Sequence, residues 1–207
     1  MSRRIVLAGI PLLMFLGSGA YVARQRQLSG SMVAPRGSDV AVLAGGCYWG
    51  VESVFRHVRG VTSVTSGFAM PVPATPNERP GPAEAVRLEY NPSQISYHKI
   101  LEIFFTVVHD PTQVNRQGPD VGPEYRSMIF TAPPQQAAAR AFIDSLTAAH
   151  VYTRPIATRI AALESFEPAD PSQQNYAETH PNSRYVVIND VPKLKALAER
   201  FPSVYRR

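Results

Sequence analysis

The chain has 207 residues, of which 44% are hydrophobic and 18% are charged, as in an ordinary globular protein. This length predicts one domain with extensions and is sufficient for a hydrophobic core. The formal net charge of +5 is not gathered into basic runs interleaved with aromatic residues, so we expect no nucleic-acid partner.

The N-terminus differs in composition from the rest of the chain. Segment 1–23 has the cationic head MSRR followed by the uncharged stretch IVLAGIPLLMFLGSGAYVA. This pattern predicts a signal peptide or membrane anchor over 1–23, a linker over 24–38 and one folded domain over 39–207. We therefore expect an exported protein, periplasmic or anchored facing an oxidising compartment. We expect it to be a monomer that meets a membrane only through segment 1–23, if that segment stays uncleaved.

Strands and helices alternate after the linker. The apolar run 39–46 predicts a strand ending in a glycine turn, and the apolar spacing over 47–58 predicts a helix. Further strands are expected at 61–69, 84–90, 126–130 and 156–163, and further helices at 97–108, 133–149 and 192–200. Two long loops, 70–83 and 109–125, are rich in proline and polar residues, which is typical of functional loops. The order predicts an α+β fold, a two-layer sandwich of the ferredoxin-like split βαβ kind with long irregular loops.

Cys47 is the only cysteine, and it stands between two glycines and the aromatic pair Tyr48 and Trp49. It cannot form an internal disulfide, so in an oxidising compartment its free thiol points to chemistry rather than packing. The residue falls at the junction of the first strand and helix, where free N–H groups and the helix dipole favour an anion. We therefore expect the Cys47 thiol to have a pKa below that of a free cysteine.

Three other residues are candidates for chemistry. Glu84 begins a strand after a proline-rich loop, where partial burial would raise its pKa towards proton donation. Asp120 and Tyr125 contribute polar groups from the second long loop. A cysteine hydrolase would need a histidine base, and His109 is the best candidate for it. There is no C-x-x-C and no Cys/His cluster with metal-ligand spacing, so we expect no metal and no bound cofactor.

Four stretches resemble one known family. The octapeptide GCYWGVES (46–53) closely resembles the active-site signature of the A-type peptide methionine-S-sulfoxide reductases. The likeness covers about 39–202 and includes AEAVRLEYNPSQISYHKILEIFF, HDPTQVNRQGPDVGPEYRSMIF and HPNSRYVVINDVPKLKALAERFP. The resemblance implies thiol-dependent reduction of methionine-S-sulfoxide, peptide-bound or free, and repair of oxidised proteins. Cys47 would attack the sulfoxide sulfur and become a sulfenic acid, while Glu84 would protonate the sulfoxide oxygen.

The resemblance also implies a substrate-binding set. Tyr48 and Trp49 would form an apolar wall for the S-methyl group, Tyr125 would donate a second hydrogen bond, and Asp120 would hold waters and catalytic groups. Phe68 stands where the family has a tyrosine that helps to bind the sulfoxide oxygen.

Other departures concern the C-terminal part. Segment 169–176, ADPSQQNY, has Asp170 and Gln173 where the family usually has Glu and His, and no resolving cysteine follows. The sulfenic acid would then be reduced by an external thiol protein, thioredoxin-like or glutathione/glutaredoxin-like. These departures leave a degenerate, non-catalytic methionine-sulfoxide-binding paralogue as an alternative.

Overall fold

The computed structural model describes residue 37 and residues 39–207. The predicted signal peptide or anchor (1–23) and the predicted linker (24–38), apart from Gly37, lie outside the described residues. Within the described part, no helix combines the length and the apolar composition needed to cross a membrane.

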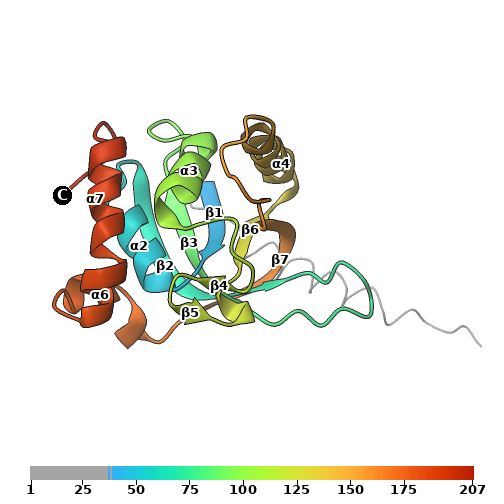
Figure 1. Ribbon diagram of the computed structural model, residues 1–207, viewed down its shortest axis with the longest axis horizontal. Helices are drawn as coiled ribbons and strands as arrows, with labels where there is room; N and C mark the ends of the chain where they lie inside the picture. Colours follow the sequence, from blue (N-terminus) through green and yellow to red (C-terminus); the bar gives the residue numbers. More distant parts are fainter. Residues whose placement is uncertain (1–36, 38) are drawn as a thin grey trace, which may run out of the picture.

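The predicted alternation of elements is present in the structure, as Figure 1 shows. The main elements are β1 (Asp39–Gly45), α2 (Tyr48–Arg56), β2 (Val61–Pro71), β3 (Ala83–Tyr90), α3 (Tyr97–Ile103), β6 (Ser127–Thr131), α4 (Pro133–Ala148), β7 (Arg159–Pro168), α6 (Arg184–Asn189) and α7 (Val191–Arg200). Short elements fill the connections: a π-helical turn (Phe104–Val108), β4 (Arg116–Gln117), β5 (Asp120–Val121), 3-10 turns at Pro123–Tyr125 and Pro171–Gln173, and α5 (Tyr176–Thr179). The sequence patterns did not predict β4, β5, α5 or α6, because each is too short to show a hydrophobic period.

Four strands form the split βαβ arrangement. Strand β1 pairs antiparallel with both β3 and β6, and β3 pairs antiparallel with β2. Strands β1 and β2 are therefore parallel, with β3 between them, and α2 connects them. Strands β3 and β6 are related in the same way through α3, with β1 between them. The α+β prediction is confirmed.

Strand β7 changes the shape of this sheet. It pairs parallel with β6 and antiparallel with β2, and so closes the five strands into a ring in the order β1-β3-β2-β7-β6. The strand predicted at 156–163 is the right element, but its sequence gave no sign that it joins both edges. Closure leaves neither edge strand of the four-stranded sheet exposed to pairing with another chain.

Two apolar clusters follow from the ring. Alternate residues of β1 point to opposite sides: Val40, Val42 and Ala44 into the ring, and Ala41 and Leu43 towards the helices. The inner cluster contains many small side chains, among them Ala69, Ala83 and Ala85, which suit the narrow interior of a five-stranded ring. The outer cluster packs the ring against α2 and α3. Both faces of β1 are thus buried, which explains its continuous apolar run.

Candidate active site

Cys47 lies two residues after the end of β1, directly before the first residue of α2. The turn that places it there requires glycine, because Gly46 has φ +92° and a Cβ on it would lie 2.5 Å from the Cβ of Gln117. Gln117 belongs to the predicted loop 109–125, so this loop packs directly over the turn beside the thiol. Its side-chain amide bonds both the N–H and the C=O of Asp110, at 3.1 Å each, which holds the loop in shape.

The predicted low pKa of the Cys47 thiol is wrong for the protein without substrate. Only 8% of Cys47 is exposed, and burial, with the Glu84 carboxylate as the second cause, raises the pKa of the thiol to about 12. Hydrogen bonds from the Trp49 backbone N–H and from Tyr185 lower the pKa, but by less. Cys47 lies at the helix terminus as predicted, but burial raises the thiol pKa by more than the helix terminus lowers it.

Glu84 lies at the same helix terminus and competes for its N–H groups. It is the second residue of β3, and its Oε2 accepts a hydrogen bond of 3.1 Å from the Tyr48 N–H. Burial is the largest cause that raises the pKa of Glu84, to about 7; the Tyr48 hydrogen bond opposes it and the negative charge of Asp120 adds to it. The expectation of a partly buried carboxyl with a raised pKa is confirmed. Such a group exchanges a proton readily at neutral pH.

Aromatic rings cluster around Tyr48 and Trp49, the two residues that follow Cys47. Tyr48 packs against Trp49, with ring centroids 6.3 Å apart, and against Phe68 at 5.8 Å with an edge-on geometry. Phe68 on β2 is the register partner of Glu84 on β3, so the two side chains leave the sheet on the same face. Trp49 stacks on Tyr176 with centroids 3.8 Å apart and meets Tyr185 edge-on at 5.6 Å. The two residues of the predicted wall, Tyr48 and Trp49, are therefore in contact, and Phe68 joins them through Tyr48.

Asp120 and Tyr125 reach the site from the loop after α3. Burial is the largest cause that raises the pKa of the Tyr125 hydroxyl, to about 12, and the negative charges of Glu84, Asp120 and Cys47 add to it. The next residue, Arg126, donates to the carbonyls of Pro82 at 3.1 Å and Gly81 at 2.6 Å. These two bonds fix the end of the proline-rich loop just before Glu84, so both long loops contribute to one site.

Tyr185 is a site residue that sequence reasoning missed. Its hydroxyl donates to Asp120 Oδ2 at 2.5 Å and also hydrogen-bonds the Cys47 thiol. Because one hydroxyl carries one proton, Asp120 and the Cys47 sulfur are two acceptors for the same Tyr185 donor. Burial and the charges of Cys47 and Asp120 raise the pKa of Tyr185. The only available signal was its place inside the family-like stretch 180–202.

The predicted alternative of a Cys47–His109 pair is not formed. Nδ1 of His109 lies 2.9 Å from the Phe104 carbonyl, and Nε2 lies 2.7 Å from Ser127 Oγ. Burial lowers the pKa of His109 to about 4, so the ring is neutral and part of the interior behind β1. Among the described residues, no group of three or more His, Cys, Asp or Glu side chains is arranged to hold a metal ion.

Comparison with known proteins gives a consistent picture. The family described as "Peptide methionine sulfoxide reductase" matches residues 39–204. The chain is 40% identical over 179 residues to peptide methionine sulfoxide reductase MsrA 2 of Mesorhizobium japonicum, covering 83% of this chain and 92% of the relative. It is 43% identical over 172 residues to MsrA of Halobacterium salinarum, covering 80% and 97%.

Solved structures share the fold. Mxr1 of Saccharomyces cerevisiae in reduced form matches with a TM-score of 0.64 and 25% identity, over 72% of this chain and 90% of that one. Methionine sulfoxide reductase A of Corynebacterium diphtheriae matches with a TM-score of 0.60 and 31% identity, over 72% and 77%.

Proposed function

Because the chain belongs to the peptide methionine sulfoxide reductase family, and is therefore an oxidoreductase that reduces methionine sulfoxide, we propose that Cys47 and Glu84 carry out the reaction. The observation that carries the proposal is the shared helix terminus. A thiol and a carboxyl with a pKa of about 7 meet at the first N–H groups of α2. The carboxyl can pass a proton at neutral pH in either direction.

The sulfur of Cys47 attacks the sulfoxide sulfur as Glu84 protonates the sulfoxide oxygen. The attack forms an S–S bond, which breaks again as the oxygen passes from the substrate sulfur to Cys47. The S–O bond of the substrate is thereby replaced by an S–O bond on Cys47. The substrate sulfur is reduced by two electrons to the thioether of methionine, and Cys47 is oxidised to a sulfenic acid. The thiol proton of Cys47 replaces the proton that Glu84 lent, so no net proton is consumed. Tyr125 donates to the oxygen, and Asp120 holds Tyr185 against the thiol.

The high pKa of the thiol gives the substrate a role in activation. In the free protein the Glu84 carboxylate opposes ionisation of Cys47. When Glu84 carries a proton and shares it with a sulfoxide oxygen, that opposing charge disappears and a positive charge develops on the sulfur under attack. The thiolate is therefore favoured only with the substrate in place, which protects a free thiol in an oxidising compartment from other reactions.

The site favours one epimer because three groups on the sulfoxide sulfur need three different surroundings. The methyl group packs on the wall of Tyr48 and Trp49, the oxygen meets Glu84 and Tyr125, and the peptide leaves by the remaining direction. The mirror-image sulfoxide would place either its oxygen on the rings or its methyl group on the carboxyl. We propose reduction of the S epimer.

Recycling requires an external thiol, because Cys47 is the only cysteine of the chain. A thiol of the reductant attacks the sulfenic sulfur, releases water and leaves a mixed disulfide, which a second thiol then cleaves. A thioredoxin-like protein is the first candidate: the yeast relative Mxr1 has also been solved in complex with Trx2. A glutathione/glutaredoxin-like donor is the second. Export through segment 1–23 and a monomeric state complete the proposal.

The decisive experiment gives the purified protein each epimer of a methionine-sulfoxide peptide, with dithiothreitol as reductant. We expect turnover of the S epimer only, and loss of turnover in Cys47→Ser. Equal turnover of both epimers would contradict the proposed geometry. Retained activity in Cys47→Ser would remove the proposed nucleophile. Fractionation of cells producing the full chain tests export, and sedimentation tests the monomer.

A further inference from the structure

We propose that Glu52 is a positioning residue for the aromatic wall of the active site. Its buried side chain holds the segment 174–176 in place, so that Tyr176 supports the ring of Trp49. The inference rests on the proposed function, which gives the Trp49 ring its substrate methyl group.

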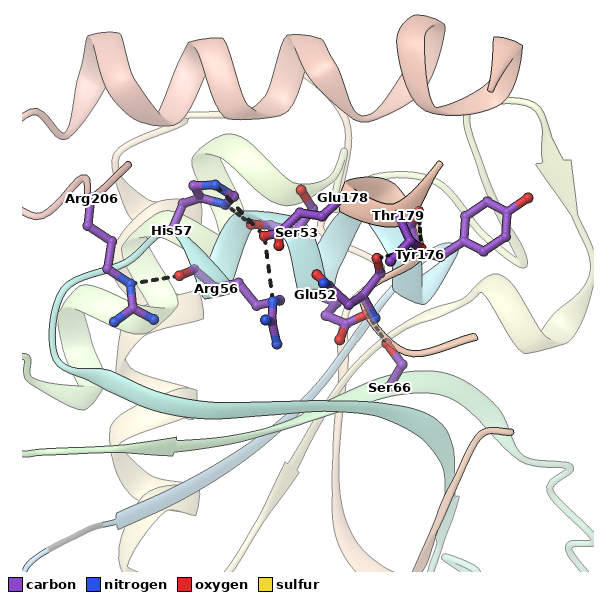
Figure 2. Close-up of polar contacts among 10 residues, drawn as sticks. Glu52, Ser53, Arg56, His57, Ser66, Tyr176, Glu178, Thr179 and Arg206 are labelled. Atoms are coloured by element: carbon purple, nitrogen blue, oxygen red, sulfur yellow. Dashed lines mark hydrogen bonds and ion pairs between the residues drawn. The ribbon is translucent and has the colours of Figure 1, made fainter. Parts of the chain in front are cut away.

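Glu52 is a carboxyl in the interior that the reaction does not use. It lies in the middle of α2, is 1% exposed, and faces β2 and the segment after β7. Its Oε2 accepts hydrogen bonds from Ser66 Oγ at 2.9 Å and from the Asn175 N–H at 2.8 Å. Figure 2 shows Glu52 between Ser66 of β2 and the turn that leads to Tyr176. Burying a carboxyl costs free energy unless hydrogen bonds satisfy it. A hydrocarbon side chain would avoid this cost, so the carboxyl at position 52 points to a role for its hydrogen bonds.

The bond to Asn175 acts on the neighbouring residue. Asn175 has φ 55°, a left-handed conformation, and it directly precedes α5, which begins at Tyr176. Helix α5 has only four residues, too few to hold itself in place by its own hydrogen bonds. The Glu52 tether therefore sets where the Tyr176 ring lies, and this ring stacks on Trp49 at 3.8 Å with an interplanar angle of 11°.

A second set of bonds fixes the same segment independently of Glu52. The side-chain amide of Gln174 accepts from the Ser66 N–H at 2.9 Å and donates to the carbonyls of Ser66 and Ala169, at 2.9 and 3.0 Å. These bonds hold residue 174 on β2, whereas the Glu52 bond holds residue 175 on α2. Loss of Glu52 should therefore displace the turn and the Tyr176 ring while leaving residue 174 anchored.

Glu52 acts on the Trp49 ring indirectly, through the segment that carries Tyr176. Glu52 and Trp49 are three residues apart on α2, but their side chains are connected through a segment more than 120 residues later in the chain. Tyr176 covers one face of the Trp49 ring, and the proposed function makes this ring part of the wall for the substrate methyl group. Without that support the Trp49 ring samples other rotamers. Ordering the ring when the substrate binds then reduces the net free energy of binding. The cost appears mainly in KM, because ground state and transition state use the same wall.

The test measures KM, kcat and tryptophan emission in a small set of variants. Glu52→Leu removes the acceptor and should raise KM for the sulfoxide peptide roughly five- to ten-fold, with kcat within about two-fold. Glu52→Met, which is unbranched, is the second variant if the leucine disturbs folding. Glu52→Gln keeps an accepting oxygen and should restore KM to within about two-fold. Ser66→Ala removes only the other bond to Glu52, and is the matched control.

Trp49 is the only tryptophan of the chain, so its emission reports on the stack directly. We expect quenching by acrylamide to increase in Glu52→Leu and Glu52→Met, and to stay unchanged in Glu52→Gln and Ser66→Ala. This measurement needs no turnover. If the unmodified protein reduced no sulfoxide, the proposed function would fail, while the quenching would still report on the tether.

A double-mutant cycle decides whether Glu52 acts through Tyr176. Tyr176→Leu should raise KM by a similar factor, and adding Glu52→Leu to it should change KM by less than about two-fold. An unchanged KM in Tyr176→Leu would overturn the inference, whatever the folding of the Glu52 variants. Full multiplication of the two effects would also overturn it, because Glu52 would then act by another route.

Discussion

Replacing Phe68 by tyrosine should accelerate sulfoxide reduction. Phe68 is the register partner of Glu84 across the β2–β3 pair, and its ring meets Tyr48 edge-on at 5.8 Å. The irregularity between Met70 and Pro71 in the β2–β7 pairing comes after this position. The proline-rich loop therefore has not moved residue 68 away from the site. A hydroxyl on this ring would be added on the face that carries Glu84, where the sulfoxide oxygen is expected.

The size of the gain follows from exposure. A neutral hydrogen bond contributes about 0.5–1.5 kcal/mol when it is protected from water. Phe68 is 38% exposed, so the new hydroxyl competes with solvent and belongs in the lower part of that range, about 0.5–1 kcal/mol. If the bond strengthens as charge develops on the oxygen, the rate should rise roughly two- to five-fold.

The assay is a single-turnover measurement with excess enzyme and an S-sulfoxide peptide, so that recycling by the external thiol does not hide the reductive step. Phe166→Tyr is the matched control, because it adds the same hydroxyl to the adjacent strand β7, where the ring packs against Gly67. We expect no change in that variant. A flat rate in Phe68→Tyr, together with a loss of rate in Tyr125→Phe, would refute the reasoning and leave Phe68 as a packing residue.

Four further outcomes are expected. Glu84→Gln should slow the single-turnover step roughly 10²–10⁴-fold with KM nearly unchanged, because its proton is needed only as the S–O bond breaks; an unchanged rate would remove Glu84 from the mechanism. Alkylation of Cys47 in the free protein should inflect well above the ordinary thiol pKa, and Glu84→Gln should lower the inflection because it removes an opposing negative charge; an inflection at or below 9.0, the ordinary value, would refute burial as the dominant cause. Tyr185→Phe should slow alkylation at pH 9, because the lost hydrogen bond raises the thiol pKa further; faster alkylation would contradict this. Gly67→Ala should lower the free energy of unfolding in urea by about 1–3 kcal/mol, because its Cβ would collide with the Glu167 carbonyl, whereas Gly81→Ala, with no atom nearby, should not.

Residues 39–131 were the most predictable part of the fold. Apolar residues that recur every 2 residues predicted the strands of both split βαβ units, and a period of 3.6 residues predicted their helices, to within a few residues. This works because each element buries one face, and the apolar pattern shows which face it is. The pairing of β7 with both β6 and β2 was not predictable in this way. A strand's own pattern shows that it is buried, but the choice of neighbours depends on the shape of the sheet that is already there.

For the site, the resemblance of long stretches to one family was enough to propose Cys47, Tyr48, Trp49, Glu84, Asp120 and Tyr125 as candidates. The turn at Gly46 and the raised pKa of Glu84 also followed from local position. Tyr185 and Glu52 could not be assigned a role, since each acts through a partner distant in sequence, and no spacing records such a contact.

The direction of the Cys47 pKa shift separates the two sources of information most clearly. Sequence by itself determined that a lone thiol stands at the N-terminus of a helix, and from this the helix dipole alone predicts a lowered pKa. Only the tertiary structure decided how deeply the thiol is buried and that Glu84 lies beside it, and these two effects raise the pKa to about 12. Desolvation depends on every atom that packs around a group, and most of those atoms come from parts of the chain far from residue 47.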